Sequence, residues 1–128
     1  MARIILAAGD AVTGQLIADQ MFEAGHALGV IDDGATALEL MRARPPHLAI
    51  IDCATPGLSG VELVRAMRSD GQLCHVPVLM LTARHSQVDE AVAFSAGVDD
   101  YLQKPADLYL LVGRVDALLS RASQARVA

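Results

Sequence analysis

Short apolar runs alternate along this chain with longer segments in which apolar residues recur every three or four positions. An apolar run of about five residues is typical of a buried strand, and the wider spacing is typical of a helix with one buried face. Strands are therefore predicted at residues 3–8, 26–31, 47–52, 77–81 and 100–103. Helices are predicted from a cap at Asp10 to about Ala24, from 34 to the Pro45 and Pro46 pair, from Ser59 or Gly60 onward, at 86–96, and from Asp107 onward.

The regular order of these elements predicts the fold class. Five strand–helix units in series favour an α/β domain with a parallel sheet, right-handed crossovers and helices on both faces. The last helix carries Leu111, Val115 and Leu118 at helical spacing, which predicts that one side of it faces the core. We expect one domain over residues 1–122, followed by a frayed tail at 123–128.

Composition and charge narrow the function classes. At 128 residues and 53% hydrophobic content, the chain can bury a core but has little room for a second domain. A net charge of −5 argues against nucleic acid or an anionic membrane surface as a partner. No apolar stretch approaches the roughly 20 residues of a membrane span and no secretory segment is recognisable, so we expect a cytoplasmic protein. Two cysteines are too few for a disulfide framework, and the four histidines lack metal-ligand spacing.

Three polar residues close apolar runs at positions where chemistry is expected. Asp52 ends the third predicted strand, Thr82 follows the fourth and Lys104 follows the fifth. Because the carboxyl ends of parallel strands meet at one edge of a sheet, a carboxylate, a hydroxyl and an ammonium group are expected together there. A carboxylate nucleophile with a cation and a donor nearby is suited to forming an acyl phosphate.

The order and spacing of several motifs extend this interpretation. They comprise Ile50 and Ile51 before Asp52, then Pro56, Gly57 and Gly60, the run at 81–83, the run at 96–102, and Lys104 with Pro105. In this arrangement the chain resembles a receiver domain of two-component response regulators, from Arg3 to about Arg121. The resemblance implies a flavodoxin-like (βα)5 three-layer sandwich whose five-stranded parallel sheet has the order 2-1-3-4-5.

The resemblance also implies roles for the candidate site residues. Asp52 would accept a phosphoryl group from the phosphohistidine of a histidine kinase or a phosphotransfer protein, and Thr82 and Lys104 would each contact a phosphoryl oxygen. Tyr101 would be the aromatic that swings inward when Thr82 moves, acting as a switch by population shift. The Lys104–Pro105 bond is expected to be the cis peptide of the family.

One departure from the family pattern concerns the metal. Receiver domains carry two consecutive acids after the first strand that hold Mg²⁺ together with the phosphoacceptor, and here these positions are Ala8 and Gly9. Of the oxygen ligands, Asp52 and the carbonyl of Ala54 remain, and Asp10 is the candidate third ligand, with a helix N-cap as its alternative role. We therefore expect weak Mg²⁺ binding. Two other replacements for the missing ligands are open. The acids of the turn at Asp32 and Asp33 would bind the metal, where the alternative is a solvated turn, or a partner would supply the missing groups.

The same departure leaves two functions open. In the first, the domain is a phosphoacceptor, favoured by the intact Asp52, Thr82, Lys104 and Tyr101. In the second, it is a pseudo-receiver, a protein-interaction module that works without phosphorylation, favoured by Ala8 and Gly9. Neither function is enzymatic, and we expect no enzyme.

A nucleotide-binding loop is the competing motif. Gly9 and Gly14 have the glycine spacing of a Walker A loop between a strand and a helix. Gln15 stands where that loop needs its lysine, and Leu16 stands where Mg²⁺ needs a hydroxyl. The sequence therefore argues against a nucleotide-binding enzyme.

Unusual apolar residues also mark one predicted surface. Leu108, Tyr109 and Leu110 begin the last helix, Ala106 precedes them in place of a bulky aromatic, and Val92 lies between Ala91 and Phe94, which are expected to point inward. They predict an apolar patch over the fourth helix, fifth strand and fifth helix, for a second copy of the chain or an effector protein. The alternative is that Leu108 and Leu110 pack locally and compensate for Ala106.

Overall fold

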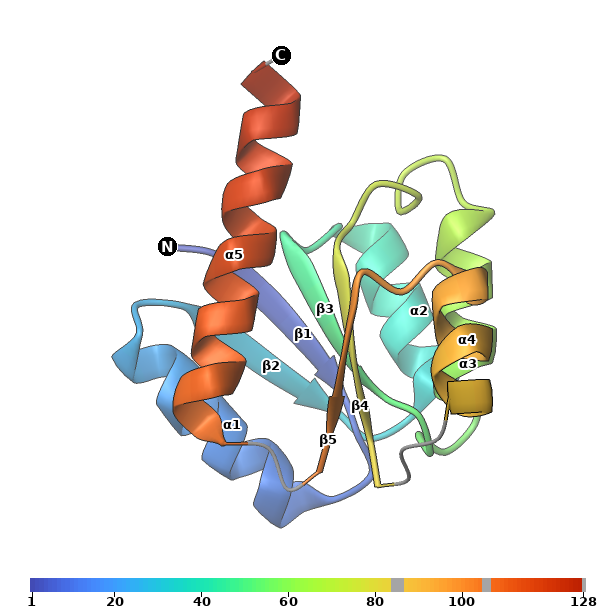
Figure 1. Ribbon diagram of the computed structural model, residues 1–128, viewed down its shortest axis with the longest axis horizontal. Helices are drawn as coiled ribbons and strands as arrows, with labels where there is room; N and C mark the ends of the chain where they lie inside the picture. Colours follow the sequence, from blue (N-terminus) through green and yellow to red (C-terminus); the bar gives the residue numbers. More distant parts are fainter. Residues whose placement is uncertain (84–86, 105–106, 128) are drawn as a thin grey trace.

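The computed structural model describes residues 1–83, 87–104 and 107–127 and shows five strands alternating with five helices (Figure 1). The strands are β1 Arg3–Ala7, β2 Ala27–Ile31, β3 Leu48–Asp52, β4 Val78–Thr82 and β5 Asp100–Gln103. The helices are α1 Ala11–Glu23, α2 Gly34–Ala43, α3 Gly60–Arg68, α4 Gln87–Ala96 and α5 Leu108–Val127.

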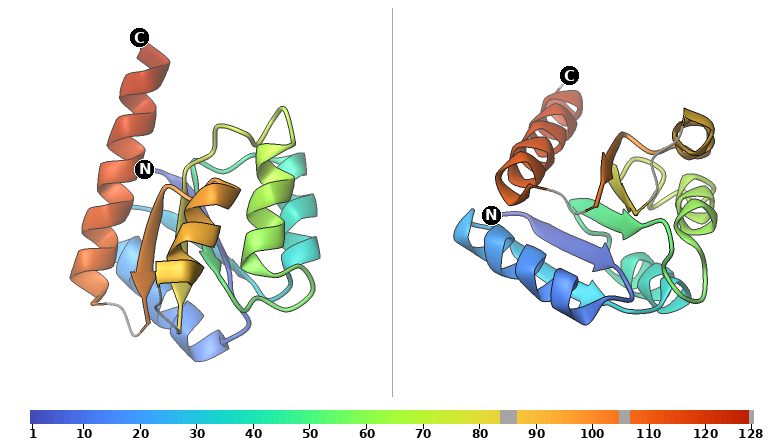
Figure 2. Two further views of the ribbon diagram at one scale, coloured as in Figure 1. Left: turned by 45° about the vertical axis from the view of Figure 1, so that its right-hand side comes forward. Right: turned by 60° about the horizontal axis from the view of Figure 1, so that its bottom comes forward.

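All strand pairs are parallel, and the sheet order is β2-β1-β3-β4-β5. Helices α1 and α5 cover one face of the sheet, and α2, α3 and α4 cover the other (Figure 2). This is the predicted flavodoxin-like three-layer sandwich, so the expected fold class and strand order are confirmed. The order places β1, β3 and β4 side by side, with their carboxyl ends at one edge.

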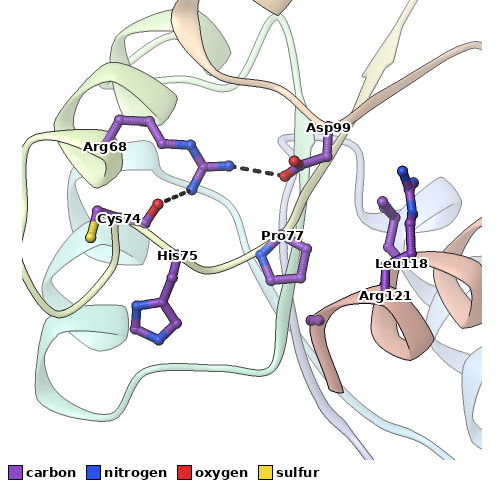
Figure 3. A pocket seen from close by; sticks show the side chains of 8 residues that line it. Arg68, Cys74, His75, Pro77, Asp99, Leu118 and Arg121 are labelled. Atoms are coloured by element: carbon purple, nitrogen blue, oxygen red, sulfur yellow. Dashed lines mark hydrogen bonds and ion pairs between the residues drawn. The ribbon is translucent and has the colours of Figure 1, made fainter. Parts of the chain in front are cut away.

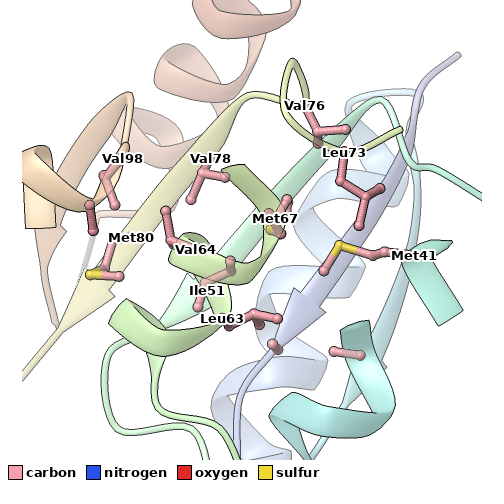
Figure 4. Packing of buried hydrophobic residues seen from close by; sticks show 14 of the residues in the cluster. Met41, Ile51, Leu63, Val64, Met67, Leu73, Val76, Val78, Met80 and Val98 are labelled. Carbon is pink, nitrogen blue, oxygen red and sulfur yellow. The ribbon is translucent and has the colours of Figure 1, made fainter. Parts of the chain in front are cut away.

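The core lies in two layers, one on each face of the sheet. Alternate residues of β3 serve opposite layers: Ile51 packs with α2, α3 and α4 (Figure 4), whereas Ile50 packs with α1 and α5. Every residue of β3 and β4 is buried, as expected for central strands of a parallel sheet covered on both faces. The acid that ends β3 is therefore carried by a backbone with very little freedom to move.

The predicted helix starts are confirmed where the structure describes them. Asp10 is the N-cap of α1, and its carboxylate accepts from the N–H groups of Val12 and Thr13. Ser59 caps α3 in a capping box with Glu62. Asp107 accepts from the N–H groups of Tyr109 and Leu110 at the start of α5.

Several boundaries differ from the expectation. The strand β1 ends at Ala7, so Ala8 lies beyond it, and β4 includes Thr82. The helix α5 continues to Val127, so residues 123–127 are helical where a frayed tail was expected. The helix α4 begins at Gln87 among the described residues, and its expected start at Ser86 lies outside them.

The inward face of α4 is also not the predicted one. Ala93 and Ala96 are buried in the core, whereas Ala91 is exposed and Phe94 is 43% exposed. The prediction that Ala91 and Phe94 point inward is wrong. The small side chains of Ala93 and Ala96 let α4 lie close to the sheet, and the larger ring of Phe94 remains at its rim.

Arg68, at the end of α3, joins three segments near the amino-terminal ends of β4 and β5 (Figure 3). Asp52 lies at the other, carboxyl-terminal end of the strands. The guanidinium of Arg68 donates to the carbonyl of Gly97 from Nε and Nη2 and to those of Cys74 and Val76 from Nη1. Nη2 also lies 3.0 Å from the carboxylate of Asp99, which in turn accepts from the N–H of Val78. One side chain thus fixes the starts of β4 and β5 relative to α3.

Among the described helices, none combines the length and the apolar character that crossing a membrane would require.

Candidate functional site

Asp52 and Lys104 form the centre of the site at the carboxyl edge of the sheet. Asp52 is 5% exposed, and its Oδ2 lies 2.5 Å from the Nζ of Lys104, while its Oδ1 accepts from the N–H of Ala54 at 3.0 Å. Lys104 directly follows β5, and its own N–H donates to the carbonyl of Thr82. The carboxylate, the hydroxyl and the ammonium group predicted to meet at this edge are therefore supplied by three neighbouring strand ends.

Thr82 and Tyr101 connect this edge to the core on the α4 side. Tyr101 is 9% exposed and packs in that core layer, with its ring centroid 6.4 Å from that of Phe94. Burial raises the pKa of Tyr101, and a side-chain hydrogen bond with Thr82 partly opposes the rise. The proposed switch aromatic is thus in an inward position and coupled directly to Thr82.

The loop after β3 is held close to the sheet by two glycines. The N–H of Gly60 donates to the carbonyl of Cys53, and a Cβ on Gly60 would lie 2.8 Å from the carbonyl oxygen of Asp52. The N–H of Gly34, at the start of α2, donates to the carbonyl of Pro56 at 2.7 Å, and a Cβ there would meet Leu58 O at 2.2 Å. Only residues without a side chain allow these approaches, which fix the turn that carries Ala54.

The positions of the missing acids offer no side-chain oxygen ligand. Ala8 is 4% exposed and packs with the core beneath α1. Gly9 lies against Pro56, and a Cβ at Gly9 would be 3.0 Å from the Cδ of that ring. In place of the carboxylates there is apolar packing.

The acids considered as substitutes serve the helices instead. The pKa of Asp10 is lowered, chiefly by the hydrogen bond from the Thr13 hydroxyl and with a contribution from the charge of Lys104, so its carboxylate is committed to the α1 cap. Asp33 caps α2 through Thr36, which lowers its pKa, and Asp32 is exposed. Within the described residues, no three His, Cys, Asp or Glu side chains are grouped as a metal site. The residues present do not fit an octahedral Mg²⁺ site of the usual kind.

Restoring the two acids is expected to create Mg²⁺ affinity. In the variant Ala8→Asp/Gly9→Asp, two carboxylates join Asp52 at the edge, and Pro56 must shift by a few tenths of an ångström to admit the new Cβ at position 9. Isothermal titration calorimetry should show saturable Mg²⁺ binding at millimolar concentration or below in the variant, and at least about tenfold weaker binding in the wild type. Adding Asp52→Asn to the variant should weaken the gained binding. Equal affinities in wild type and variant would contradict this account of the site.

Sequence comparison identifies the family of this fold and site. A family profile described as the response regulator receiver domain matches residues 4–116, so the chain belongs to that family. Its homologues are two-component response regulators, and receiver domains are signalling modules and not enzymes. Membership implies partnership with a histidine kinase.

Relatives support this assignment and show its limits. The chain is 42% identical over 101 residues to the transcriptional regulatory protein CseB of Streptomyces avermitilis, covering 79% of this chain and 42% of that protein. The chain spans about half the length, or less, of the curated relatives that it matches. The Francisella response regulator 1452 receiver domain has a TM-score of 0.88 and 30% identity over 94% of this chain and 98% of the other.

A further solved structure bears on the metal. The receiver domain of the sensor histidine kinase PA1611 from Pseudomonas aeruginosa has a TM-score of 0.86 and 25% identity, covering 93% of this chain and 98% of the other. That structure holds a magnesium ion coordinated in the active-site cleft. Receiver domains of this family thus coordinate Mg²⁺ in the active-site cleft.

One buried polar residue at the site was not singled out from the sequence. Thr55 is 4% exposed, and its hydroxyl lies within hydrogen-bonding distance of main-chain oxygens on two strands. The sequence signal was faint, because a threonine before Pro56 is an ordinary residue of a turn.

Proposed function

We propose that Asp52 accepts a phosphoryl group from the phosphohistidine of a histidine kinase or a phosphotransfer protein. The supporting observation is the buried Asp52 carboxylate, ion-paired with Lys104 at the carboxyl edge of the sheet. One carboxylate oxygen attacks phosphorus, the phosphorus–nitrogen bond of the donor breaks, and the leaving imidazole nitrogen takes up a proton. The product is an acyl phosphate on Asp52.

Lys104 and Thr82 stabilise the transferred group in this proposal. The ammonium of Lys104 already contacts Asp52, so it lies where the developing negative charge needs a cation. The hydroxyl of Thr82 is engaged with Tyr101, and a new bond from Thr82 to a phosphoryl oxygen would compete with it. Tyr101 therefore reports phosphorylation through a change in the population of its inward position.

Mg²⁺ has a reduced role in the proposed reaction. Asp52 and the carbonyl of Ala54 are the oxygen ligands left near the edge, and Asp10 would join them only by giving up its bonds at the α1 cap. With apolar packing at Ala8 and Gly9, we expect weak Mg²⁺ affinity and slow phosphorylation by small donors. A kinase or phosphotransfer partner that supplies charged groups of its own would raise the rate.

A hollow of about 510 Å³ between α1 and α5 provides access for the donor. Asp10, Thr13 and Lys104 are polar residues of its lining, and Leu16, Leu81 and Leu108 are among the apolar ones. Val12 and Leu16 on α1 are also exposed, so an amphipathic helix of the donor would find an apolar surface next to the acceptor. We propose that this encounter takes place in the cytoplasm, as expected from the sequence.

The face formed by α4, β5 and α5 is the proposed surface for a second copy of the chain or an effector protein. Val92, Tyr109 and Leu110 are exposed on it, at 42%, 81% and 46%, and Phe94 adds its exposed edge. Leu108, in contrast, is partly buried against the core, as the local-packing alternative expected for it. The patch is thus smaller than the sequence indicated and is centred on Tyr109 and Leu110.

Removing both side chains is expected to weaken association through this face. In Tyr109→Ala/Leu110→Ala the dissociation constant of a dimer should rise at least about tenfold, because the two most exposed apolar side chains of this face are lost. Sedimentation velocity over a range of concentrations measures it, with Phe22→Ala on α1 as an exposed apolar control. A variant that associates as the wild type does, or a wild type that is monomeric throughout, would remove this face as a dimer surface.

The phosphoacceptor proposal is tested by intact-mass spectrometry after incubation with phosphoramidate, in EDTA and in Mg²⁺. A gain of one phosphoryl group on the wild-type chain supports it. The second candidate, a pseudo-receiver that binds partners without phosphorylation, is favoured by Ala8, Gly9 and the commitment of Asp10 to the α1 cap. No gain with phosphoramidate or with a phosphorylated histidine donor would favour that candidate.

A further inference from the structure

Thr55 is a buried hydroxyl that the proposed reaction does not use. In the described part of the chain, the buried polar or charged residues are Asp52, Thr55 and Thr82. Two of them belong to the phosphoacceptor site, and Thr55 lies three residues after the acceptor. A buried hydroxyl has a cost unless it forms hydrogen bonds, so its partners indicate its role.

Those partners lie on two neighbouring strand ends. Oγ1 of Thr55 is 3.0 Å from the carbonyl oxygen of Ala7, the last residue of β1, and 2.5 Å from that of Asp52, the last residue of β3. The hydroxyl has a single proton to donate, which it shares between these two acceptors. Thr55 therefore bridges the carboxyl ends of β1 and β3.

This bridge extends the link between the strands beyond their paired residues. The β1–β3 register ends with Ala7 opposite Ile51, so Asp52 has no partner on β1. On its other side Asp52 is opposite Leu81 of β4, whose carbonyl also accepts from the N–H of Cys53. Ala8 and Gly9 offer no side-chain oxygen toward β3, directly or through a metal. Thr55 is the side chain that ties the acceptor to the β1 side.

We propose that Thr55 is a positioning residue that holds the Asp52 turn in its reactive arrangement without a metal ion. It acts through the backbone of Asp52 and through Ala54, the preceding residue, whose N–H donates to Oδ1 of Asp52. Loss of the bridge lets the turn move, and the carboxylate then loses its orientation toward Lys104 and the donor. The inference rests on the proposed phosphoacceptor function for its effect on rate, but its effect on the turn is independent of it.

The test compares Thr55→Val, which keeps the shape and removes the hydroxyl, with Thr55→Ser, which keeps the hydroxyl. The rate of phosphoryl transfer from phosphoramidate is measured in EDTA, at a temperature where all variants are folded. Thr55→Val should react about 10-fold more slowly than the wild type, because small misplacements of reacting groups have large effects on rate. Thr55→Ser should stay within about twofold of wild type. The control Ser69→Ala removes a hydroxyl bond to the carbonyl of Arg65, far from the site, and should label normally.

Amide hydrogen exchange measured by NMR gives the second readout. The N–H of Ala54 should lose protection about 10-fold in Thr55→Val and keep it in Thr55→Ser, while the N–H of Val78 at the other edge is unchanged in both. Unchanged Ala54 protection in Thr55→Val, or equal losses in the Val and Ser variants, would overturn the proposal. If the wild type takes up no phosphoryl group, the phosphoacceptor function fails, and the exchange data alone decide the role of Thr55.

Discussion

Replacing Asp52 by asparagine is expected to abolish phosphoryl uptake. The amide has nearly the same size as the carboxylate, so it fits the buried position, but it lacks the nucleophilic oxygen that forms an acyl phosphate. The change also removes the counter-ion of Lys104. In Asp52→Asn, intact-mass spectrometry after phosphoramidate treatment should show no added phosphoryl group, with Mg²⁺ or with EDTA.

The matched control is Asp19→Asn on the exposed side of α1, where the carboxylate accepts from Gln15. It makes the same change from a carboxylate to an amide, and this variant should still gain the mass of one phosphoryl group, as the wild type does. A phosphoryl group retained in Asp52→Asn would show that another residue is the acceptor, and the assignment of Asp52 would then be wrong. Peptide mapping of the labelled wild type identifies the modified residue directly.

Replacing Arg68 by methionine is expected to lower the free energy of unfolding by about 2–4 kcal/mol. The methionine keeps much of the apolar stem but leaves the carbonyls of Cys74, Val76 and Gly97 without their charged donor. Asp99 also loses its ionic partner and, among the described residues, keeps the bond from the N–H of Val78. Urea unfolding followed by circular dichroism measures the change.

Arg42→Met provides the comparison for this prediction. Arg42 makes an ion pair with Asp70 at 2.9 Å, and its side chain is 51% exposed, so the expected loss is about 0.5 kcal/mol or less. Similar losses in the two variants would mean that the bonds of Arg68 to main-chain carbonyls contribute little. The difference between the two losses in free energy of unfolding shows how much more a guanidinium that joins three segments contributes than a surface ion pair does.

The strands and the convergence at the sheet edge were predictable because both follow from local patterns. Continuous apolar runs indicate central strands of a parallel sheet, and parallel strands place their last residues at one edge. The proximity of Asp52, Thr82 and Lys104 was therefore predictable from the sequence. The capping role of Asp10 was among the predicted alternatives for the same reason, because an N-cap depends on residues only two or three positions away.

Other features depended on contacts that a sequence pattern does not contain. Hydrophobicity favours Phe94 over Ala93 as the inward residue of α4, but close packing on the sheet favours the smaller side chain. The acceptor of the Thr55 hydroxyl on Ala7 is 48 residues away, and the carbonyl of Gly97 is 29 residues from Arg68. Nothing in the local sequence distinguishes these polar residues from ordinary turn and surface residues.

The division of the core into two layers affects which partners can bind this domain together. The hollow beside Lys104 opens between α1 and α5, whereas Tyr101 packs in the layer beneath α2, α3 and α4. In the proposed function, a donor seated in the hollow would contact α1 and α5 and leave the surface of α4 around Val92 and Phe94 uncovered. A partner that contacts only α4 would then bind while the donor is still in place, whereas a partner that contacts Tyr109 and Leu110, next to Leu108 in the wall of the hollow, would compete with the donor.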